Sequence, residues 1–93
     1  MFDEPIDFIP GERKIITVRI EPIDPNETVI VNKAWYELMP CGSESVLGRG
    51  DCETSGDKAE LVLGIDEKGN YTLRVTVEVG REVIKKKVSV RVR

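Results

Sequence analysis

The chain has 93 residues, of which 40% are hydrophobic and 33% charged, with a formal net charge of −3 and no histidine. This length and composition suit a single domain over residues 1–93 and exclude a disordered chain, while the apolar runs are far too short to span a membrane. Because histidine is the usual general base at neutral pH, we expect no enzyme.

The first predicted elements are an extended segment over residues 1–12 and a strand over residues 13–20. Hydrophobic and polar side chains alternate along the strand, which is typical of a strand that is buried on one side. The side chains on its predicted inward face are Ile16, Val18 and Ile20.

Residues 28–39 predict a second strand, which is rich in β-branched and aromatic residues. The alternation is irregular at Asn32 and Lys33, which predicts a bulge or a division into two strands. Successive side chains of a strand point to opposite faces, so one of the neighbours Trp35 and Tyr36 must leave the core.

Residues 46–54 predict a further strand that contains Arg49-Gly50-Asp51, the tripeptide that integrins read on extracellular ligands. Integrin recognition needs this tripeptide at an exposed loop apex of an exported protein. In a strand, Arg49 and Asp51 instead lie side by side on one face, while the glycines and Cys52 lie on the other. We therefore interpret the tripeptide as strand surface and keep Arg49 and Asp51 as candidate contact residues.

The last third of the chain predicts a strand over residues 58–65, a turn over residues 66–70, and a final hairpin. The hairpin turns at Gly80-Arg81, which has the form of a two-residue type II′ turn. Counting back from this turn places three apolar pairs opposite one another: Val77 with Ile84, Leu73 with Val88, and Tyr71 with Val90. Lys86 falls opposite Val75 on the inward side, so it must snorkel past an edge or lie at a bulge.

No stretch shows the spacing of an amphipathic helix, so we predict an all-β protein, an antiparallel two-sheet sandwich of about seven strands. Residues 66–73, DEKGNYTL, resemble the entry to the F strand of an immunoglobulin-like domain. The resemblance implies that Tyr71 packs its ring on the core and bonds its hydroxyl to nearby backbone. It also implies a core position for Trp35, which leaves Tyr36 as the outward aromatic and a candidate contact residue.

The whole layout is similar to small immunoglobulin-like proteins of phage and prophage structural gene modules. Shared features are an extended N-terminal segment, a strand ending near Trp-Tyr-x-Leu, a short glycine-rich strand, and a Gly-x-Tyr stretch before the closing hairpin. Cys41 and Cys52 do not stand at the positions of the inter-sheet disulfide of antibody domains. We expect both to be free thiols.

The charge is unevenly distributed, with −8 over residues 1–80 and +5 over residues 81–93. Lys85 and Lys87 on the last strand are therefore candidate contacts to an acidic partner or to a second copy of the chain. The alternative is that these lysines only keep an exposed sheet edge from pairing with other chains.

Metal, cofactor and nucleic-acid binding find little support in the sequence. Two cysteines without histidine cannot complete a standard zinc site, and the acidic residues between 51 and 60 lack the spacing of a calcium loop. Aromatic residues are only 5% of the chain and the net charge is negative, which disfavours nucleic acid. We also expect no small-molecule ligand and no membrane association.

Two functional hypotheses follow. The first is a non-catalytic structural or assembly module, of the phage or prophage virion type, that acts through protein–protein contacts and is cytoplasmic or virion-associated, since the chain starts without a secretion-signal pattern. The second is an exported adhesion or ligand-binding immunoglobulin-like domain from a larger surface protein. The second hypothesis predicts a disulfide between Cys41 and Cys52 and an exposed loop at residues 49–51.

Overall fold

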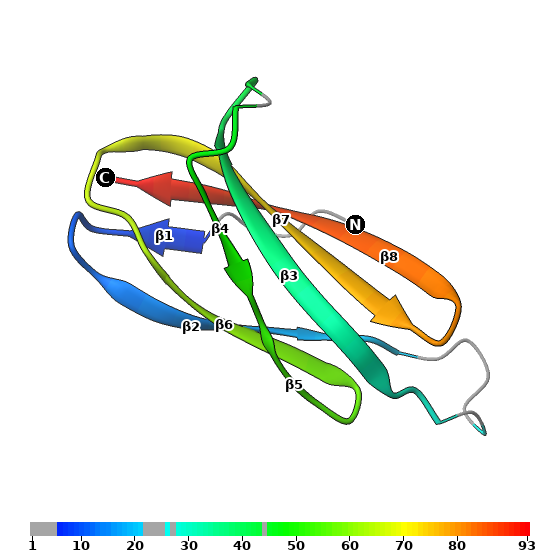
Figure 1. Cartoon of the computed structure of the whole chain (residues 1–93). Helices are drawn as coiled ribbons and strands as arrows, with labels where there is room; N and C mark the ends of the chain where they lie inside the picture. Colours follow the sequence, from blue (N-terminus) through cyan, green and yellow to red (C-terminus); the bar gives the residue numbers. More distant parts are fainter. Residues whose placement is uncertain (1–5, 22–25, 27, 44) are drawn as a thin grey trace.

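A computed structural model of the chain describes residues 6–21, 26, 28–43 and 45–93, and in these residues it contains eight strands and no helix (Figure 1). The strands are β1 (Ile6–Phe8), β2 (Arg13–Arg19), β3 (Val31–Pro40), β4 (Gly48–Asp51), β5 (Glu53–Ser55), β6 (Lys58–Gly64), β7 (Gly69–Val79) and β8 (Glu82–Val92). A five-stranded sheet has the order β1-β8-β7-β3-β4, and a three-stranded sheet has the order β2-β6-β5.

The predicted all-β, two-sheet architecture is confirmed, with two differences. The described residues form eight strands where about seven were predicted. In addition, β1 runs parallel to β8, whereas the other pairs are antiparallel, so the five-stranded sheet is mixed.

The final hairpin has the predicted register along its whole length. The apolar pairs are Val77 with Ile84, Leu73 with Val88, and Tyr71 with Val90. Gly80 has a φ of +60° and Arg81 has no positive φ, as a type II′ turn requires. The register is continuous, so Lys86 lies on the inward side opposite Val75 without a bulge, and its exposed side chain snorkels past the edge.

The irregular alternation in the second predicted strand does mark a bulge. The pairing of β3 with β7 shifts between Val31 and Lys33. A bulge inserts one extra residue and so changes which of the following side chains face inward. The orientation of the residues from Lys33 to Pro40 therefore depends on this irregularity.

One hydrophobic core lies between the two sheets. Its most deeply buried side chains are Phe8, Leu73, Val75, Val77 and Val90. Three of these belong to β7, the middle strand of the larger sheet. Tyr71, at the start of the same strand, has a buried ring, and its hydroxyl donates a hydrogen bond of 2.9 Å to the backbone oxygen of Glu67.

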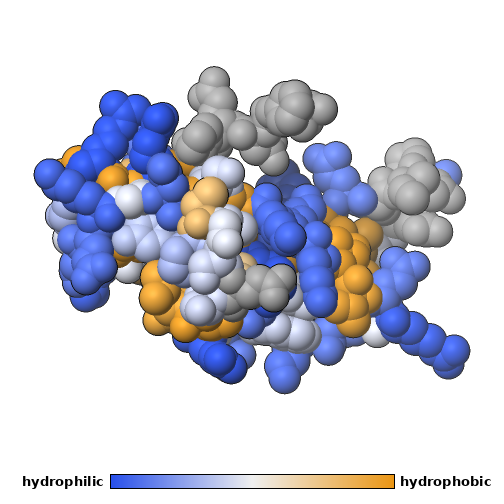
Figure 2. Space-filling view, turned by 90° about the horizontal axis from the view of Figure 1, so that it is seen from above, coloured by the Kyte–Doolittle hydropathy of each residue, from blue (hydrophilic) through white to orange (hydrophobic). Residues whose placement is uncertain are grey.

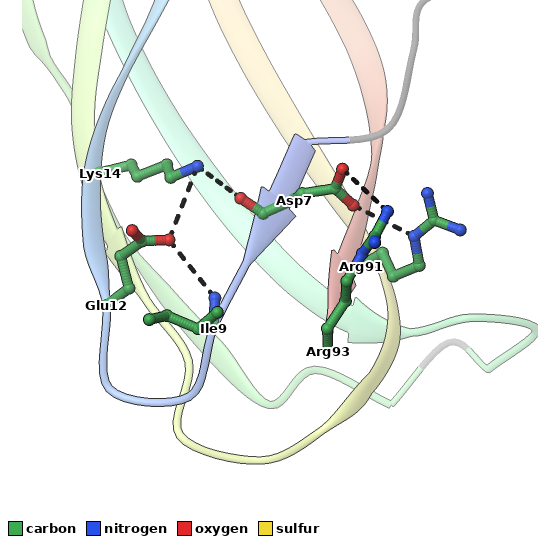
Figure 3. Close-up of polar contacts among 6 residues, drawn as sticks. All are labelled: Asp7, Ile9, Glu12, Lys14, Arg91 and Arg93. Atoms are coloured by element: carbon green, nitrogen blue, oxygen red, sulfur yellow. Dashed lines mark hydrogen bonds and ion pairs between the residues drawn. The ribbon is translucent and has the colours of Figure 1, made fainter.

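β1 lies inside the predicted N-terminal segment, whose residues 1–5 are outside the described part of the chain. Its Asp7 carboxylate accepts hydrogen bonds from Arg91 (3.1 Å) and Arg93 (3.4 Å), and its backbone oxygen accepts one from Lys14 of β2 (Figure 3). β1 thereby connects the last strand of one sheet to the first strand of the other. The hydrogen bond from Arg91 lowers the pKa of Asp7, so these contacts stabilise the fold above about pH 4 and are lost as the pH falls through that lowered pKa.

Candidate interaction site

Trp35 and Tyr36 have the reverse of their predicted positions. Trp35 pairs with Thr76 of β7 and points outward, whereas Tyr36 pairs with the fully buried Val75 and packs against the core. Lys33, two residues before Trp35, places its ammonium nitrogen 5.6 Å from the centroid of the Trp35 ring. The outward-pointing aromatic of this strand is therefore Trp35, which is half-buried, and the prediction that assigned it to the core was wrong.

The stretch predicted as one strand over residues 46–54 is divided between the two sheets. β4 pairs with β3 in the larger sheet, and β5 pairs with β6 in the smaller sheet, so the chain changes sheets at Cys52 (Figure 1). The tripeptide Arg49-Gly50-Asp51 lies within β4, as expected of strand surface. Arg49 and Asp51 share the outward face with Trp35, and Gly50 faces inward.

Gly50 accommodates the inward ring of Tyr36. The two residues are paired across β3 and β4, and a Cβ atom at Gly50 would lie 3.0 Å from Cε1 and from the hydroxyl oxygen of Tyr36. A strand glycine often marks such a close approach. The glycine of the tripeptide thus has a packing role that involves no ligand.

Replacing Gly50 by alanine is expected to lower the free energy of unfolding by about 1–2 kcal/mol, because the Tyr36 ring must move to admit a methyl group. Gly48→Ala in the same strand is the matched control, since no atom lies within 4 Å of its Cβ position. Urea denaturation of both variants checks this, and an equal loss of stability in the two would contradict the role of Tyr36.

Four of the five candidate contact residues meet on the outer face of the larger sheet. Two rows cross the strands from β4 through β3 and β7 to β8: Arg49, Glu37, Arg74, Lys87 in one and Asp51, Trp35, Thr76, Lys85 in the other. Tyr36, the fifth candidate, lies on the opposite side of the sheet. We call the outward set Lys33, Trp35, Arg49, Asp51, Lys85 and Lys87 the Trp35 face.

The Trp35 face contains a groove of about 450 Å³ between β3 and β4. Its lining residues are Lys33, Trp35, Tyr36, Glu37, Arg49, Gly50 and Asp51. Within the groove, Glu37 is engaged by Arg74, whose Nη2 lies 2.7 Å and Nε 3.2 Å from the same carboxylate oxygen. Across the described residues, the side chains of Arg49, Asp51, Lys85 and Lys87 make no hydrogen bond or ion pair with one another or with any neighbour.

Thr76 lies beneath the side chains of this face. It is only 2% exposed although it points outward, in register between Trp35 and Lys85. Neighbouring outward side chains therefore cover the sheet at this point.

The lysines of the last strand were also considered as residues that keep an exposed sheet edge from pairing with other chains. Part of β8 does have such an edge. β1 pairs with β8 only at Val90–Val92, and no other described strand pairs with the outer edge of residues 82–89. Lys86 points inward at this edge, which is a known way of keeping other chains from pairing. Lys85 and Lys87 point outward, so edge protection by Lys86 leaves both of them available for contacts.

Cys41 and Cys52 are both free thiols and cannot bond to each other within one chain. The backbone nitrogen of Cys52 bonds to Ala34, while Cys41 follows the far end of the same strand β3. At about 3.3 Å per residue, seven residues separate the two thiols by roughly 20 Å, far more than a disulfide allows. Neither the disulfide nor the exposed 49–51 loop expected of the exported hypothesis is present.

In the part of the chain that is described, no group of three or more histidine, cysteine, aspartate or glutamate side chains is placed to hold a metal ion. The same residues include no helix that is long and apolar enough to cross a membrane.

On the face shown in Figure 2, hydrophobic residues form separate patches divided by hydrophilic ones. The exposed large side chains of this type are Ile9, Ile15, Ile30, Leu47, Val62 and Val83. Ile15 and Val62 are a cross-strand pair on the outer face of the smaller sheet, where they line a pocket together with Asp51 of the Trp35 face.

Sequence reasoning missed Trp35, Lys33 and the pair of Glu37 with Arg74. The alternation of Ala34, Tyr36 and Leu38, which all face inward, could have predicted that Trp35 points outward. That signal is ambiguous by itself, because Met39 on the opposite face is also apolar and buried.

No protein-family model matches the chain, and no curated protein matches it either. The crystal structure of an engineered protein is similar in fold, with a TM-score of 0.72 at 12% sequence identity. The likeness covers 96% of this chain and 18% of that protein's chain, so the present fold corresponds to a small part of a much longer polypeptide. At this identity the likeness concerns the fold alone.

Proposed function

We propose that this chain is a non-catalytic protein-binding module that docks a partner protein, or a second copy of itself, on the Trp35 face. The observation that carries the proposal is the outward position of Trp35 beside Arg49, neither of which is used to hold the core together. Tryptophan and arginine are the residues most enriched among those that dominate binding energy at protein interfaces.

The lack of a candidate catalytic group supports binding rather than catalysis. The chain has no histidine, and burial, followed by the charge of Asp51, raises the pKa of Cys52 to about 11. A thiol with this pKa is almost wholly protonated at neutral pH and is a poor nucleophile.

The proposed setting is that of small immunoglobulin-like structural proteins of phages and prophages. It is supported by the pattern of the last strands and by the hydrogen bond from Tyr71 to Glu67, a contact of the kind found in immunoglobulin-like sandwiches. Capsid or tail genes beside the gene for this chain would support the setting, whereas an upstream segment encoding a secretion signal would favour the exported alternative.

Affinity purification with tagged protein tests the proposed function. We expect wild-type protein to retain a partner, or itself, and Trp35→Ala to weaken this binding about thirtyfold or more, because an aromatic residue at the centre of an interface is the usual site of such a loss. Ile9→Ala is the control, since Ile9 is 61% exposed and lies between β1 and β2, outside the Trp35 face. Equal retention by all three proteins, or no retention together with a monomer at low salt in light scattering, would refute the proposal.

A further inference from the structure

We propose that the Trp35 face binds an acidic, extended segment of a partner protein, which lies across the strands from β4 to β8. The inference rests on the proposed function and adds to it the chemistry and direction of the bound segment. It is drawn from the charges, the spacing and the aromatic content of this face.

The outer face of the larger sheet is basic although the whole chain is acidic. Six basic side chains point outward from its strands: Lys33, Arg49, Arg74, Lys85, Lys87 and Arg91. Four acidic side chains also point outward from these strands: Asp7, Glu37, Asp51 and Glu78. The face therefore carries +2 in a chain whose net charge is −3.

Ion pairs within the face leave its central cations available. Glu37 is bound by Arg74, and Asp7 by Arg91. Arg49, Lys85 and Lys87 form no ion pair within the described part of the chain, and neither does Lys33, whose ammonium group lies over the Trp35 ring. Outside ion pairs, the face thus presents four cations to a partner against two acidic side chains, Asp51 and Glu78, and this excess favours acidic side chains on the partner.

The spacing of these cations fits an extended polypeptide. Neighbouring strands lie about 4.8 Å apart, so Arg49 on β4 and Lys87 on β8 are separated by roughly 14 Å across β3 and β7. Alternate side chains of an extended segment lie about 7 Å apart, so a segment of about five residues presents three side chains over that distance. Trp35 lies between the two ends, where it offers an apolar surface and the groove of about 450 Å³.

The aromatic content of the face favours a peptide over an anionic polysaccharide. Chains that bind by stacking need several exposed rings in succession. Among the described aromatic residues, Phe8 and Tyr71 are buried and Tyr36 packs on the core, so Trp35 is the one whose side chain points outward from this face. One aromatic anchor surrounded by basic side chains is instead typical of a protein interface.

The fluorescence of Trp35 gives a direct test, because Trp35 is the single tryptophan of the chain. Hexaglutamate is titrated into the intact protein at low salt, with hexalysine, hexaserine and hexagalacturonate as comparison probes. We expect hexaglutamate alone among the peptides to change the Trp35 emission and to shift the Trp35 indole N–H resonance in NMR spectra. Added salt should weaken the binding.

Paired charge variants locate the contact. Lys85→Gln with Lys87→Gln is expected to raise the Kd for hexaglutamate roughly three- to tenfold, since two exposed charge contacts are lost. Lys58→Gln with Lys68→Gln removes the same charge away from the Trp35 face and is expected to change the Kd less than about twofold.

Three results would overturn the inference: no response to hexaglutamate, an equal loss of affinity in both double variants, or tighter binding of hexagalacturonate, which would indicate a saccharide site. These failures differ from a failure of the proposed function. If Trp35→Ala still abolishes partner retention while hexaglutamate does not bind, the face docks a protein and only its acidic chemistry is wrong.

Discussion

Replacing Leu73 by alanine is expected to lower the free energy of unfolding by about 3–4 kcal/mol, the largest effect on stability that we predict for a single substitution. Leu73 is 0% exposed in β7, the middle strand of the larger sheet, and it pairs with Leu38 on one side and Val88 on the other. The substitution removes buried methyl groups and leaves a cavity that strands on both sides prevent from closing.

Urea or thermal denaturation measures this loss. For a domain of this size the thermal midpoint should fall by on the order of 15 °C. Leu47→Ala is the matched control, because it makes the same chemical change at a side chain that is 60% exposed, and it should cost less than about 1 kcal/mol. Similar losses in the two variants would mean that Leu73 does not lie at the centre of the core.

Alkylation of the two thiols is expected to differ in rate by about a hundredfold or more at pH 8. Cys41 is exposed after the end of β3, whereas Cys52 is partly buried at the crossing between the sheets, and its pKa is raised to about 11 by burial and by Asp51. Only the thiolate reacts, and with this pKa about one Cys52 side chain in a thousand is a thiolate at pH 8.

Mass spectrometry of iodoacetamide-treated protein follows the two sites separately. The rate at Cys52 should rise about tenfold per pH unit between pH 8 and pH 10, as its thiolate fraction grows. In urea, where the fold no longer protects Cys52, the difference should largely disappear. Equal rates in the folded protein at pH 8 would contradict the position of Cys52 between the sheets.

The raised pKa of Cys52 also has a consequence for stability. The unfolded chain loses the Cys52 proton at a lower pH than the folded protein does, since the ordinary pKa is 9.0 and the folded value is about 11. The unfolded state therefore binds fewer protons between these values, and Cys52 makes the folded state less stable as the pH rises above about 9. The pH dependence of stability that Cys52 contributes is therefore opposite to that of Asp7, whose stabilising contacts are lost in acid.

Local patterns were sufficient for the final hairpin and for β2 and β6. In the hairpin, a two-residue turn joins the strands, so counting from Gly80 places Leu73 opposite Val88 without knowledge of the rest of the fold. In β2 and β6, the alternation places Ile16, Val18, Leu61 and Leu63 on the buried face. The period of two in the side chains and the short turn carry this information within the sequence itself.

The same patterns were insufficient for β3 and for the strand that contains the tripeptide. Apolar residues occupy both faces near the end of β3, at Leu38 and Met39, and the bulge at Lys33 interrupts the alternation. The inward choice of Tyr36 follows from its pairing with Val75 and Gly50, which lie far away in the sequence. The resemblance to immunoglobulin-like domains implied a core position for Trp35, and that prediction was wrong.

The sequence by itself determined the all-β class, the inward faces of the regular strands and the register of the closing hairpin, because these depend on neighbours a few residues apart. The tertiary structure alone decided which strands share a sheet, where Cys52 carries the chain from one sheet to the other, and that Arg49 and Lys87 lie on one face with Trp35. Sheet order results from burying both inner faces at once, so no local pattern records it. The candidate contact residues acquire a common site only through that order.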